Sequence, residues 1–418
     1  MKLLVITDSY PPHHSGGYEL RCKEVLDLLV ERGHAVEIIT TQCDDKECNL
    51  HDREQKNIHR ELHRIQDTEG VIKKIHIEYS DLRYLHAKIK ELKPDLIYLW
   101  HIINYTRSLF PYLAGIDIPI VFDEGGKGIA WAWSHHGIWY NFIEKRGKSF
   151  IKNALKEILG IIGSRLSSNV LKRDWRWPER LSGYFNSRSG MEYARELGVP
   201  LQGCSVIHSG LSMKEFPFVP KAGIESRIQL LLPGRIAEIK GQKDIIQILL
   251  RLKKENLPAH ATIVGAVFSE AYYGELVQEV EKHGLGSQIS ILPKVEHGEM
   301  KNLYQAANIC FFPSYQKFGF SRIPLEAMAS GCLVITYGNE DSCEIIENNE
   351  TGFIVSEGDC EAMVQIVQQM VFSPHRYGRI LQQARARVEK DHEIGKYIDK
   401  IERFLNRAVL EQHGTISS

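Results

Sequence analysis

Short apolar runs alternate with amphipathic helical segments in both halves of this chain, and this alternation most constrains its fold. In the first half, strand-like runs cover 2–7, 34–41, 95–100 and 118–123, and helical patterns lie between them. Apolar runs bounded by turn residues are typical of buried strands, and strands that alternate with helices pair in parallel. The sequence therefore predicts an α/β fold with two doubly wound, Rossmann-like domains that face a central cleft. The runs of the second half are 228–234, 260–265, 289–294, 309–314 and 332–336.

The domain boundaries follow from where this alternation stops. We predict an N-terminal domain over 1–210, a C-terminal domain over 211–375, and a helical segment over 376–418 that crosses back to the N-terminal domain. An insert at 127–186 interrupts the first domain, and it holds five of the six tryptophans and 11 Lys/Arg against 4 Asp/Glu. Ligands of doubly wound sheets bind outside the carboxyl ends of the strands, so the residues that follow each strand are candidates for a site.

Bulk composition excludes several classes of protein. The chain has 418 residues and a formal net charge of −1, which argues against a general nucleic-acid binder. Its eight cysteines form no C-x-x-C pair and no cluster with zinc spacing, so we expect reduced thiols. The apolar run at the start is too short for a signal-peptide core, and no apolar stretch reaches membrane-spanning length. We therefore expect a cytoplasmic protein.

Two glycine-bearing loops follow strand-like runs. Gly16 and Gly17 precede a helix, where glycine lets the backbone approach a ligand and the helix N-terminus favours an anion. A tight strand–helix turn explains the same pair equally well, and no G-x-G-x-x-G is present. Arg235 and Lys240 lie in GRIAEIKG, at the carboxyl end of the run at 228–234. Two cations there suit a diphosphate, and a solvated loop is the alternative.

The stretch FGFSRIPLEAMASG, 318–331, is the most informative part of the chain. Pro324 suits the first turn of a helix, which places Glu326 near the N-terminus of that helix. A carboxylate there either stabilises the helix end or accepts hydrogen bonds from a sugar diol, while free N–H groups of the same turn meet a phosphate. Taken alone, this residue does not separate the two interpretations.

The same stretch resembles the signature of the retaining glycosyltransferases of the GT-B fold, family 4, also called group 1. The resemblance covers nearly the whole chain and includes PPHHSGG, LLVERGHAVEIIT, PDLIYLWH, VIHSGLSMKEF, GRIAEIKG and LYQAANICFFPS. It implies transfer of a hexose or deoxyhexose, with retention of configuration, from a nucleoside diphosphate sugar to a glycan, lipid-linked or small-molecule acceptor. It also implies that neither a cofactor nor a metal ion is needed, and the chain has no Asp-x-Asp motif.

The resemblance assigns roles to particular residues. By this likeness Arg235 and Lys240 stabilise the leaving diphosphate and are the catalytic candidates, and Glu326 binds the ribose hydroxyls. Gly16 and Gly17 form the loop that meets the donor phosphate and the acceptor. The remaining donor-binding candidates flank the base or line the loop before Glu326; they are Gly265, Lys294, Val295, Phe318, Gly319, Phe320, Ser321, Arg322 and Ile323.

Three departures from the family pattern fall where the donor sugar is normally bound. The first glutamate of the usual Glu-x7-Glu pair is Phe318, and Gln316 is the nearest polar alternative. The Gly-Gly that usually precedes Glu344 is 340–341, Glu-Asp, and the family's histidine after the fourth core strand is Gly125. Because a phenyl ring cannot accept hydrogen bonds from hydroxyls, we expect a 6-deoxy or otherwise less polar donor sugar.

The insert at 127–186 is the expected acceptor surface. Its aromatic rings suit sugars, and its cations suit a lipid phosphate or the inner face of a membrane. The acceptor candidates are Trp131 and Trp133 in the insert, together with Glu124 and His101 near strand ends. For the helix SFIKNALKEILGIIG, packing in a core or a subunit interface is the alternative.

Three functions fit this sequence. An active glycosyltransferase is the first. A catalytically weakened homologue that binds nucleotide or glycan as a partner subunit is the second, and Phe318 favours it. A nucleotide-sugar epimerase of related fold is the third, and the elaborate insert disfavours it. Hydrolysis of a donor by the purified protein, with release of free nucleoside diphosphate, separates the first two.

Overall fold

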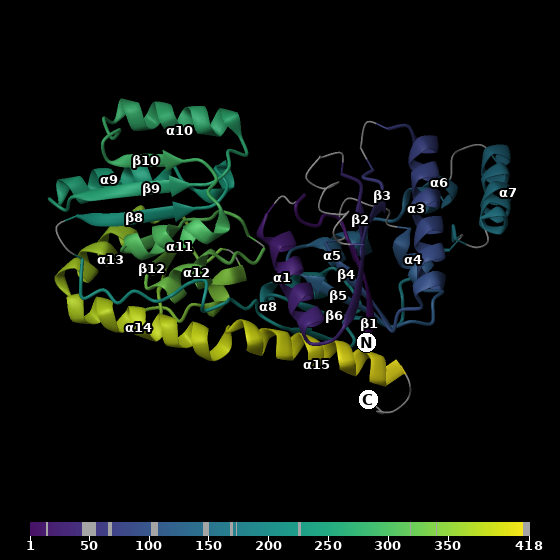
Figure 1. Ribbon diagram of the computed structural model, residues 1–418. Helices are drawn as coiled ribbons and strands as arrows, with labels where there is room; N and C mark the ends of the chain where they lie inside the picture. Colours follow the sequence, from purple (N-terminus) through teal and green to yellow (C-terminus); the bar gives the residue numbers. More distant parts are fainter. Residues whose placement is uncertain are drawn as a thin grey trace. The chain divides into compact units, whose positions relative to one another are not determined.

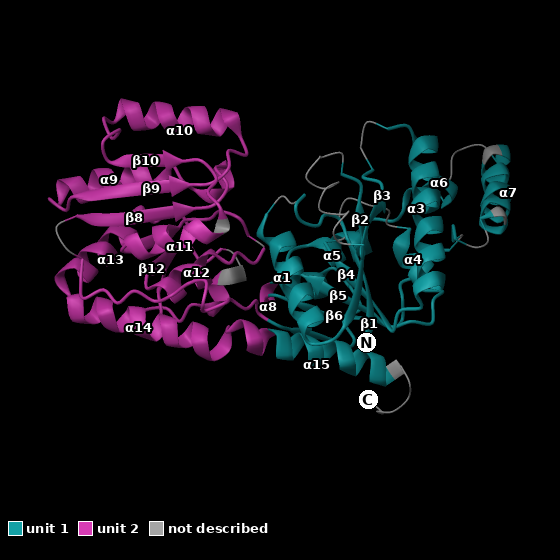
Figure 2. Cartoon of the chain, in the orientation of Figure 1, with its two compact units in different colours: residues 1–186, 190–207, 398–418 teal, residues 187–189, 208–397 magenta. Residues whose placement is uncertain are grey.

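The computed structural model describes residues 1–13, 16–43, 56–65, 69–101, 108–144, 150–167, 170–172, 174–224, 227–317, 319–339 and 341–412. The chain divides into two compact units (Figure 2). Unit 1 comprises Met1–Asn186, Gly190–Ile207 and Ile398–Ser418, and unit 2 comprises Ser187–Ser189 and His208–Tyr397.

Unit 1 is built on a seven-stranded sheet in which every strand pairs in parallel with its neighbours (Figure 1). The strand order is β3-β2-β1-β4-β5-β6-β7. The strands are β1 (Lys2–Thr7), β2 (Ala35–Thr41), β3 (Ile58–Leu62), β4 (Leu96–Trp100), β5 (Ile120–Glu124), β6 (Leu181–Phe185) and β7 (Cys204–Val206). The helices are α1 (Gly17–Glu31), α3 (Val71–Leu92), α4 (Leu109–Leu113), α5 (Gly128–Ser134), α6 (Ile138–Glu144), α7 (Phe150–Leu166) and α8 (Arg188–Glu196).

The core of unit 1 explains why its strands read as continuous apolar runs. Every residue of β4 and β5 is buried, as expected for parallel strands that are covered by helices on both faces. In the register of the sheet, Val5 of β1 lies between Ile38 of β2 and Tyr98 of β4. The chain changes direction across the sheet between β1 and β4, and a ligand is expected at the carboxyl ends of these two strands.

Unit 2 repeats the same topology with a six-stranded sheet whose order is β10-β9-β8-β11-β12-β13, again with all strands parallel. Its switch point therefore lies between β8 and β11. The strands are β8 (Ile228–Pro233), β9 (Ala259–Val264), β10 (Ile289–Leu292), β11 (Ile309–Phe312), β12 (Leu333–Thr336) and β13 (Phe353–Ile354). The helices are α9 (Asp244–Lys254), α10 (Glu270–Lys282), α11 (His297–Ala306), α12 (Ile323–Ser330), α13 (Cys360–Phe372) and α14 (Pro374–Asp391), with 3-10 turns η1 (Glu238–Lys240) and η2 (Asp341–Ile345).

The structure confirms the two Rossmann-like α/β domains and refines the elements. The end of the chain, expected as a single helical segment, is two helices, α14 and α15 (Ile394–Gln412), and the boundary between the units falls inside α15. Helix α3, Val71–Leu92, is the 22-residue helix between β3 and β4. Three strands of unit 1 (β3, β6 and β7) and the two-residue β13 had no counterpart among the expected runs.

Cysteine chemistry differs in part from expectation. Six cysteines are free thiols: Cys22, Cys204, Cys310, Cys332, Cys343 and Cys360. Cys43 is in a disulfide, so the prediction of reduced thiols was wrong at that position. In the described part of the chain, no helix combines the length and apolarity needed to cross a bilayer.

Candidate active site

The first loop at the switch point of unit 2 is the stretch 234–241, which follows β8. Gly241 has φ +65°, and a Cβ there would lie 2.1 Å from the carbonyl oxygen of Pro313. A side chain cannot be accommodated, so glycine is required for the close approach of this loop to the segment after β11. The backbone N–H of Tyr315 donates to the carbonyl of Ile239 at 2.8 Å, and this bond fixes the two segments side by side.

The loop after β9 packs equally closely on the other side of this stretch. A Cβ on Gly265 would lie 2.0 Å from the carbonyl oxygen of Gly234. Two backbone hydrogen bonds join the loops, from Ile236 N–H to Ala266 and from Phe268 N–H to Ile236, at 2.9 and 3.1 Å. The structure thus brings the predicted residues Arg235 and Gly265 onto adjoining loops.

Both predicted cations lie near aromatic rings. The guanidinium carbon of Arg235, an exposed residue, is 4.9 Å from the ring centroid of Phe268. The ammonium of Lys240 is 5.5 Å from the ring centroid of Phe312, the last residue of β11. Phe268 is a contact that the sequence analysis did not identify, because a loop aromatic carries no signal of its own. Lys294 is exposed and Val295 half-buried, directly after β10.

Glu326 lies in the first turn of α12, as its distance from Pro324 predicts. The carboxylate is buried, its Oε2 accepts a hydrogen bond of 3.0 Å from the Tyr304 hydroxyl, and its Oε1 lies 3.8 Å from Nε of Arg322. Burial, followed by the nearby Glu326 charge, raises the pKa of Tyr304 well above its usual value, so this hydroxyl stays protonated and donates. A carboxylate with two oxygens has acceptor capacity beyond this one bond.

The start of α12 borders the loop after β8, because a Cβ on Gly234 would lie 3.6 Å from Cδ1 of Ile323. Ser321 Oγ accepts the Ile323 backbone N–H at 3.3 Å, and the Phe320 ring stacks beside His208 at a centroid distance of 6.3 Å. Gly319 has φ +116°, and a Cβ there would lie 2.6 Å from Nε2 of Gln316. Phe318, the most unusual position of the signature, lies outside the described residues.

Glu344 in η2 binds the first two residues of α8, Arg188 and Ser189, which belong to unit 2 like Glu344 itself. Its carboxylate accepts the backbone N–H groups of Arg188 and Ser189, each at 2.9 Å, the Ser189 hydroxyl at 2.7 Å, and lies 3.1 Å from Nε2 of His208. Burial alone would raise the pKa of this carboxyl, but the hydrogen bonds from His208, Ser189 and Arg188 outweigh it and lower the pKa of Glu344 to about 2. The sequence analysis noted this glutamate but did not identify its partners.

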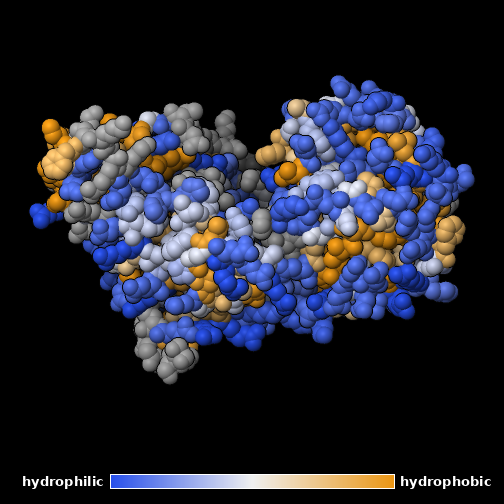
Figure 3. Space-filling model, turned by 180° about the vertical axis from the view of Figure 1, so that it is seen from behind, coloured by the Kyte–Doolittle hydropathy of each residue, from blue (hydrophilic) through white to orange (hydrophobic). Residues whose placement is uncertain are grey.

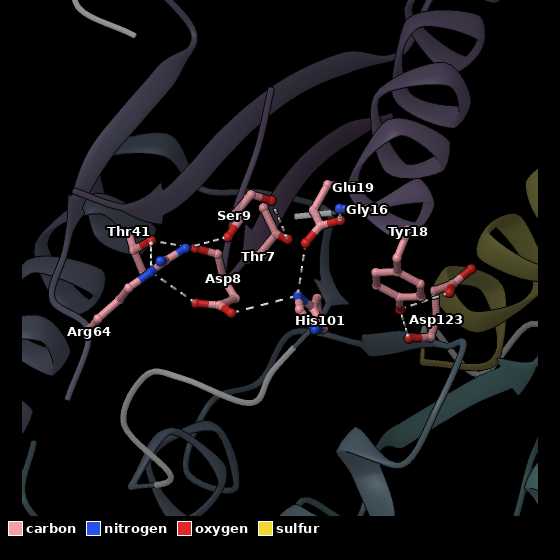
Figure 4. Close-up of polar contacts among 10 residues, drawn as sticks. All are labelled: Thr7, Asp8, Ser9, Gly16, Tyr18, Glu19, Thr41, Arg64, His101 and Asp123. Carbon is pink, nitrogen blue, oxygen red and sulfur yellow. Dashed lines mark hydrogen bonds and ion pairs between the residues drawn. The ribbon is translucent and has the colours of Figure 1, made fainter. Parts of the chain in front are cut away.

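The switch point of unit 1 holds a cluster of charged side chains (Figure 4). His101 follows β4 with φ +39°, and its Nδ1 lies 3.6 Å from Oδ2 of Asp8 and 3.6 Å from Oε1 of Glu19. Asp8 and Glu19 are buried, and Arg64 reaches the cluster from beyond β3, with Nη2 2.6 Å from Oγ of Ser9. The structure therefore brings predicted His101 together with two carboxylates that the sequence analysis missed.

Gly16 and Gly17 play separate parts in the same region. The backbone N–H of Gly16 donates to Oε2 of Glu19 at 3.1 Å, which caps the start of α1. Gly17 is exposed, and a Cβ there would meet nothing within 4 Å. The structure thus shows the helix-start role for Gly16 and an open backbone at Gly17.

Gly125, which replaces the family's histidine, has a packing explanation. A Cβ on Gly125 would lie 2.3 Å from Cε2 of Tyr18. The Tyr18 hydroxyl donates to Asp123, 2.7 Å from its carbonyl oxygen and 2.9 Å from its Oδ1, and Asp123 also forms a buried ion pair with Arg21. The tyrosine ring therefore fills the space that a side chain at residue 125 would need.

The other acceptor candidates differ in their surroundings. Both oxygens of buried Glu124 accept backbone N–H groups, from Gly126 at 2.7 Å and Ile129 at 2.6 Å, so this carboxylate stabilises the start of α5. Trp133 donates from Nε1 to the Leu197 carbonyl at 3.1 Å and packs against the core of unit 1. Half-buried Trp131 stacks on His135. Trp133 is therefore held against the core of unit 1.

Comparison with known proteins places the chain in a family. Residues 216–387 match the family described as glycosyl transferases group 1, and residues 15–214 match glycosyltransferase family 4. A glycogen synthase of Mycobacterium tuberculosis is 26% identical over 48% of this chain and 47% of its own length. An uncharacterised glycosyltransferase of Methanocaldococcus jannaschii is 22% identical over 85% of each chain. The alignment with the first of these spans about half the length of that relative.

A solved structure shows the same fold over the whole chain. HepE from Anabaena, determined in complex with UDP and glucose, superposes with a TM-score of 0.67 at 17% identity and covers 97% of this chain and 100% of its own. Both halves of the sequence thus match glycosyltransferase families. The chain belongs to the group 1 glycosyltransferases of family 4 and has the GT-B fold.

Proposed function

We propose that this protein transfers a sugar from a nucleoside diphosphate sugar, with retention of anomeric configuration, to a glycan, lipid-linked or small-molecule acceptor. The observation that carries the proposal is the switch point of unit 2. The loop after β8, which carries Arg235 and Lys240, adjoins the loop after β9. It also borders the start of α12, which carries Glu326. HepE, the neighbour of like fold, was determined with UDP, with UDP and glucose, and with UDP-glucose.

The chemistry of the proposed step is electrostatic. When the bond from the anomeric carbon to the diphosphate oxygen breaks, negative charge gathers on the leaving diphosphate. The guanidinium of Arg235 and the ammonium of Lys240 stabilise that charge, and donors preorganised for it lower the barrier. Glu326 accepts hydrogen bonds from the ribose, with Tyr304 holding its second oxygen. The acceptor hydroxyl attacks the same face of the sugar, and the leaving phosphate takes its proton.

The sequence favours a second candidate. Phe318 stands where the family has a carboxylate, which favours a weakened homologue that binds nucleotide or glycan without turnover. The protein is incubated with uridine, guanosine and thymidine diphosphate sugars, and free nucleoside diphosphate and the bound nucleotide are measured together. Release of nucleoside diphosphate that is lost in Arg235→Ala supports the transferase. Binding of a nucleotide without release supports the second candidate, and absence of both rejects the donor site.

A further inference from the structure

Helix α7 exposes an apolar stripe to solvent. Seven of the large hydrophobic side chains that are exposed in the described chain lie on this one helix, and Phe150 and Ile151 are 85% and 71% exposed. Ile151, Leu155, Ile158, Leu159 and Ile162 recur at the i, i+4, i+7, i+8 and i+11 spacing of one helix face. Figure 3 shows hydrophobic surface at its far left, where α7 lies in that view. A contiguous apolar face of this kind marks an interaction surface.

The helix is already attached through its opposite face. A Cβ on Gly163 would lie 2.5 Å from the indole of Trp139, and a Cβ on Gly160 would lie 3.7 Å from Ile143. Both partners belong to α6, so Gly163 lets α7 pack closely on that helix and Gly160 faces the same helix at ordinary contact distance. At 3.6 residues per turn, Gly160 points away from the middle of the stripe. The stripe is therefore not the surface that holds α7 to the rest of unit 1.

The charge of the segment around α7 indicates which kind of partner covers the stripe. The sequence 144–165 carries six basic residues and two acidic ones, Glu144 and Glu157. Of the residues of α7 itself, Arg165 is exposed at its end, whereas Lys156 is half-buried with its ammonium 5.3 Å from the ring centroid of Phe142 in α6. A second copy would bring two such basic segments together, and like charges oppose that contact. A lipid bilayer with anionic headgroups buries the apolar stripe among its acyl chains and attracts the basic residues to its surface.

We propose that α7 lies in the interface of an anionic lipid bilayer, with Ile151, Leu155, Ile158, Leu159 and Ile162 inserted among the acyl chains. This inference rests on the surface of α7 and not on the donor site. It narrows the expected contact from the insert at 127–186 to one face of one helix.

The test uses the full chain and vesicles of two compositions, phosphatidylcholine alone and phosphatidylcholine with about one third phosphatidylglycerol. We expect sedimentation with the anionic vesicles and at least tenfold weaker binding in Leu155→Asp/Ile158→Asp. Ile72→Asp is the matched control, since Ile72 is 83% exposed at the start of α3; this variant should bind as the wild type does. Release of donor nucleotide is measured in each variant, and we expect it to stay unchanged.

Three results would overturn the inference. No sedimentation with either vesicle removes the membrane as the partner. Equal binding to both compositions removes the role of the basic residues, and an equal loss in Ile72→Asp removes the specific role of the apolar stripe. A concentration-dependent dimer in sedimentation velocity without vesicles, abolished by Leu155→Asp/Ile158→Asp, assigns the stripe to a second copy. Circular dichroism of each variant shows that a loss of binding is not a loss of fold.

Discussion

The Tyr304 hydroxyl donates to Oε2 of Glu326 at 3.0 Å, and both groups are buried. Tyr304 comes from α11 and Glu326 from α12, so one hydrogen bond links the helix that precedes β11 in the chain to the helix that follows it. The bond holds the carboxylate in one orientation at the start of α12. A fixed carboxylate recognises a diol with less loss of side-chain freedom than a mobile one.

We expect Glu326→Ala to lower the affinity for the bare nucleoside diphosphate about tenfold or more, because hydrogen bonds to a charged group contribute roughly 1.5–3 kcal/mol. Tyr304→Phe should have a smaller effect, since it removes orientation and leaves the charge. Calorimetry with the nucleotide that the donor screen identifies measures both. Glu270→Ala is the matched control, because Glu270 is an exposed first-turn glutamate of α10. Equal affinity in Glu326→Ala and wild type would reduce Glu326 to a helix-end residue.

We expect Arg235→Ala and Lys240→Ala each to lower turnover by roughly 2–4 kcal/mol of activation barrier, the scale of losing one preorganised donor to developing charge. The effect should fall on kcat more than on KM, because the charge that they stabilise grows in the transition state. Lys253→Ala, exposed near the end of α9, is the control. Unchanged turnover in both variants would remove the diphosphate assignment.

We expect a rhamnose or fucose donor to outperform glucose, because each hydroxyl buried unpaired against the Phe318 ring costs roughly 1–3 kcal/mol. Competing turnover on the three donors measures the preference. Phe318→Glu restores the acceptor that the family has there and should shift the preference towards glucose. A preference for glucose in the wild type that persists in Phe318→Ala would show that this ring does not meet the sugar.

We expect the Glu344 carboxylate to stabilise the protein above about pH 4.5 and to lose this contribution as the pH falls. Its pKa is lowered from 4.5 to about 2 in the fold, so the folded state holds its proton less tightly than the unfolded chain does. The stabilisation is therefore present above pH 4.5 and is lost between pH 4.5 and 2. In thermal melts across that range, the deficit of Glu344→Gln relative to wild type should shrink towards pH 2. Glu350→Gln, at an exposed glutamate of the same segment, is the control for the substitution itself.

We expect the two tryptophans of α5 to separate stability from acceptor binding. Trp133→Ala should lower the free energy of unfolding by about 2–4 kcal/mol, because it removes a packed ring and the bond to Leu197. Trp131→Ala should leave thermal stability and donor hydrolysis nearly intact and reduce transfer to a glycan or lipid fraction. If donor hydrolysis falls together with transfer in Trp131→Ala, the ring supports the fold and not the acceptor.

The parts of the fold that the sequence predicts are those with strong local patterns. β1 and β12 are apolar runs closed by turn residues. β13 could not be predicted, because two residues carry no period, and its place beside β12 is decided by the sheet. β6 lies at the end of the aromatic insert. Its Ser182 and Gly183 interrupt the apolar run, so the sequence pattern does not indicate a strand there.

The residues of the candidate site likewise fall into those that local sequence predicts and those that only the fold brings together. Arg235, Lys240 and Glu326 follow strands or begin a helix, and their sequence positions alone place them at a sheet edge. The cluster of Asp8 and Glu19 around His101 depends on three segments far apart in the chain, and so does the contact of Glu344 with His208. Glu124 was predicted to bind an acceptor, and this stays a prediction; in the structure both of its carboxylate oxygens accept backbone N–H groups of its own loop.

The packing of Tyr18 over Gly125 has a consequence for substitutions at either position. Histidine at residue 125 would collide with a ring that two hydrogen bonds to Asp123 hold in place. A side chain at residue 125 therefore requires the Tyr18 ring to move or to be replaced by a smaller side chain. The residues at positions 18 and 125 are thus coupled by packing, and the effects of substitutions at the two positions on stability should not be additive.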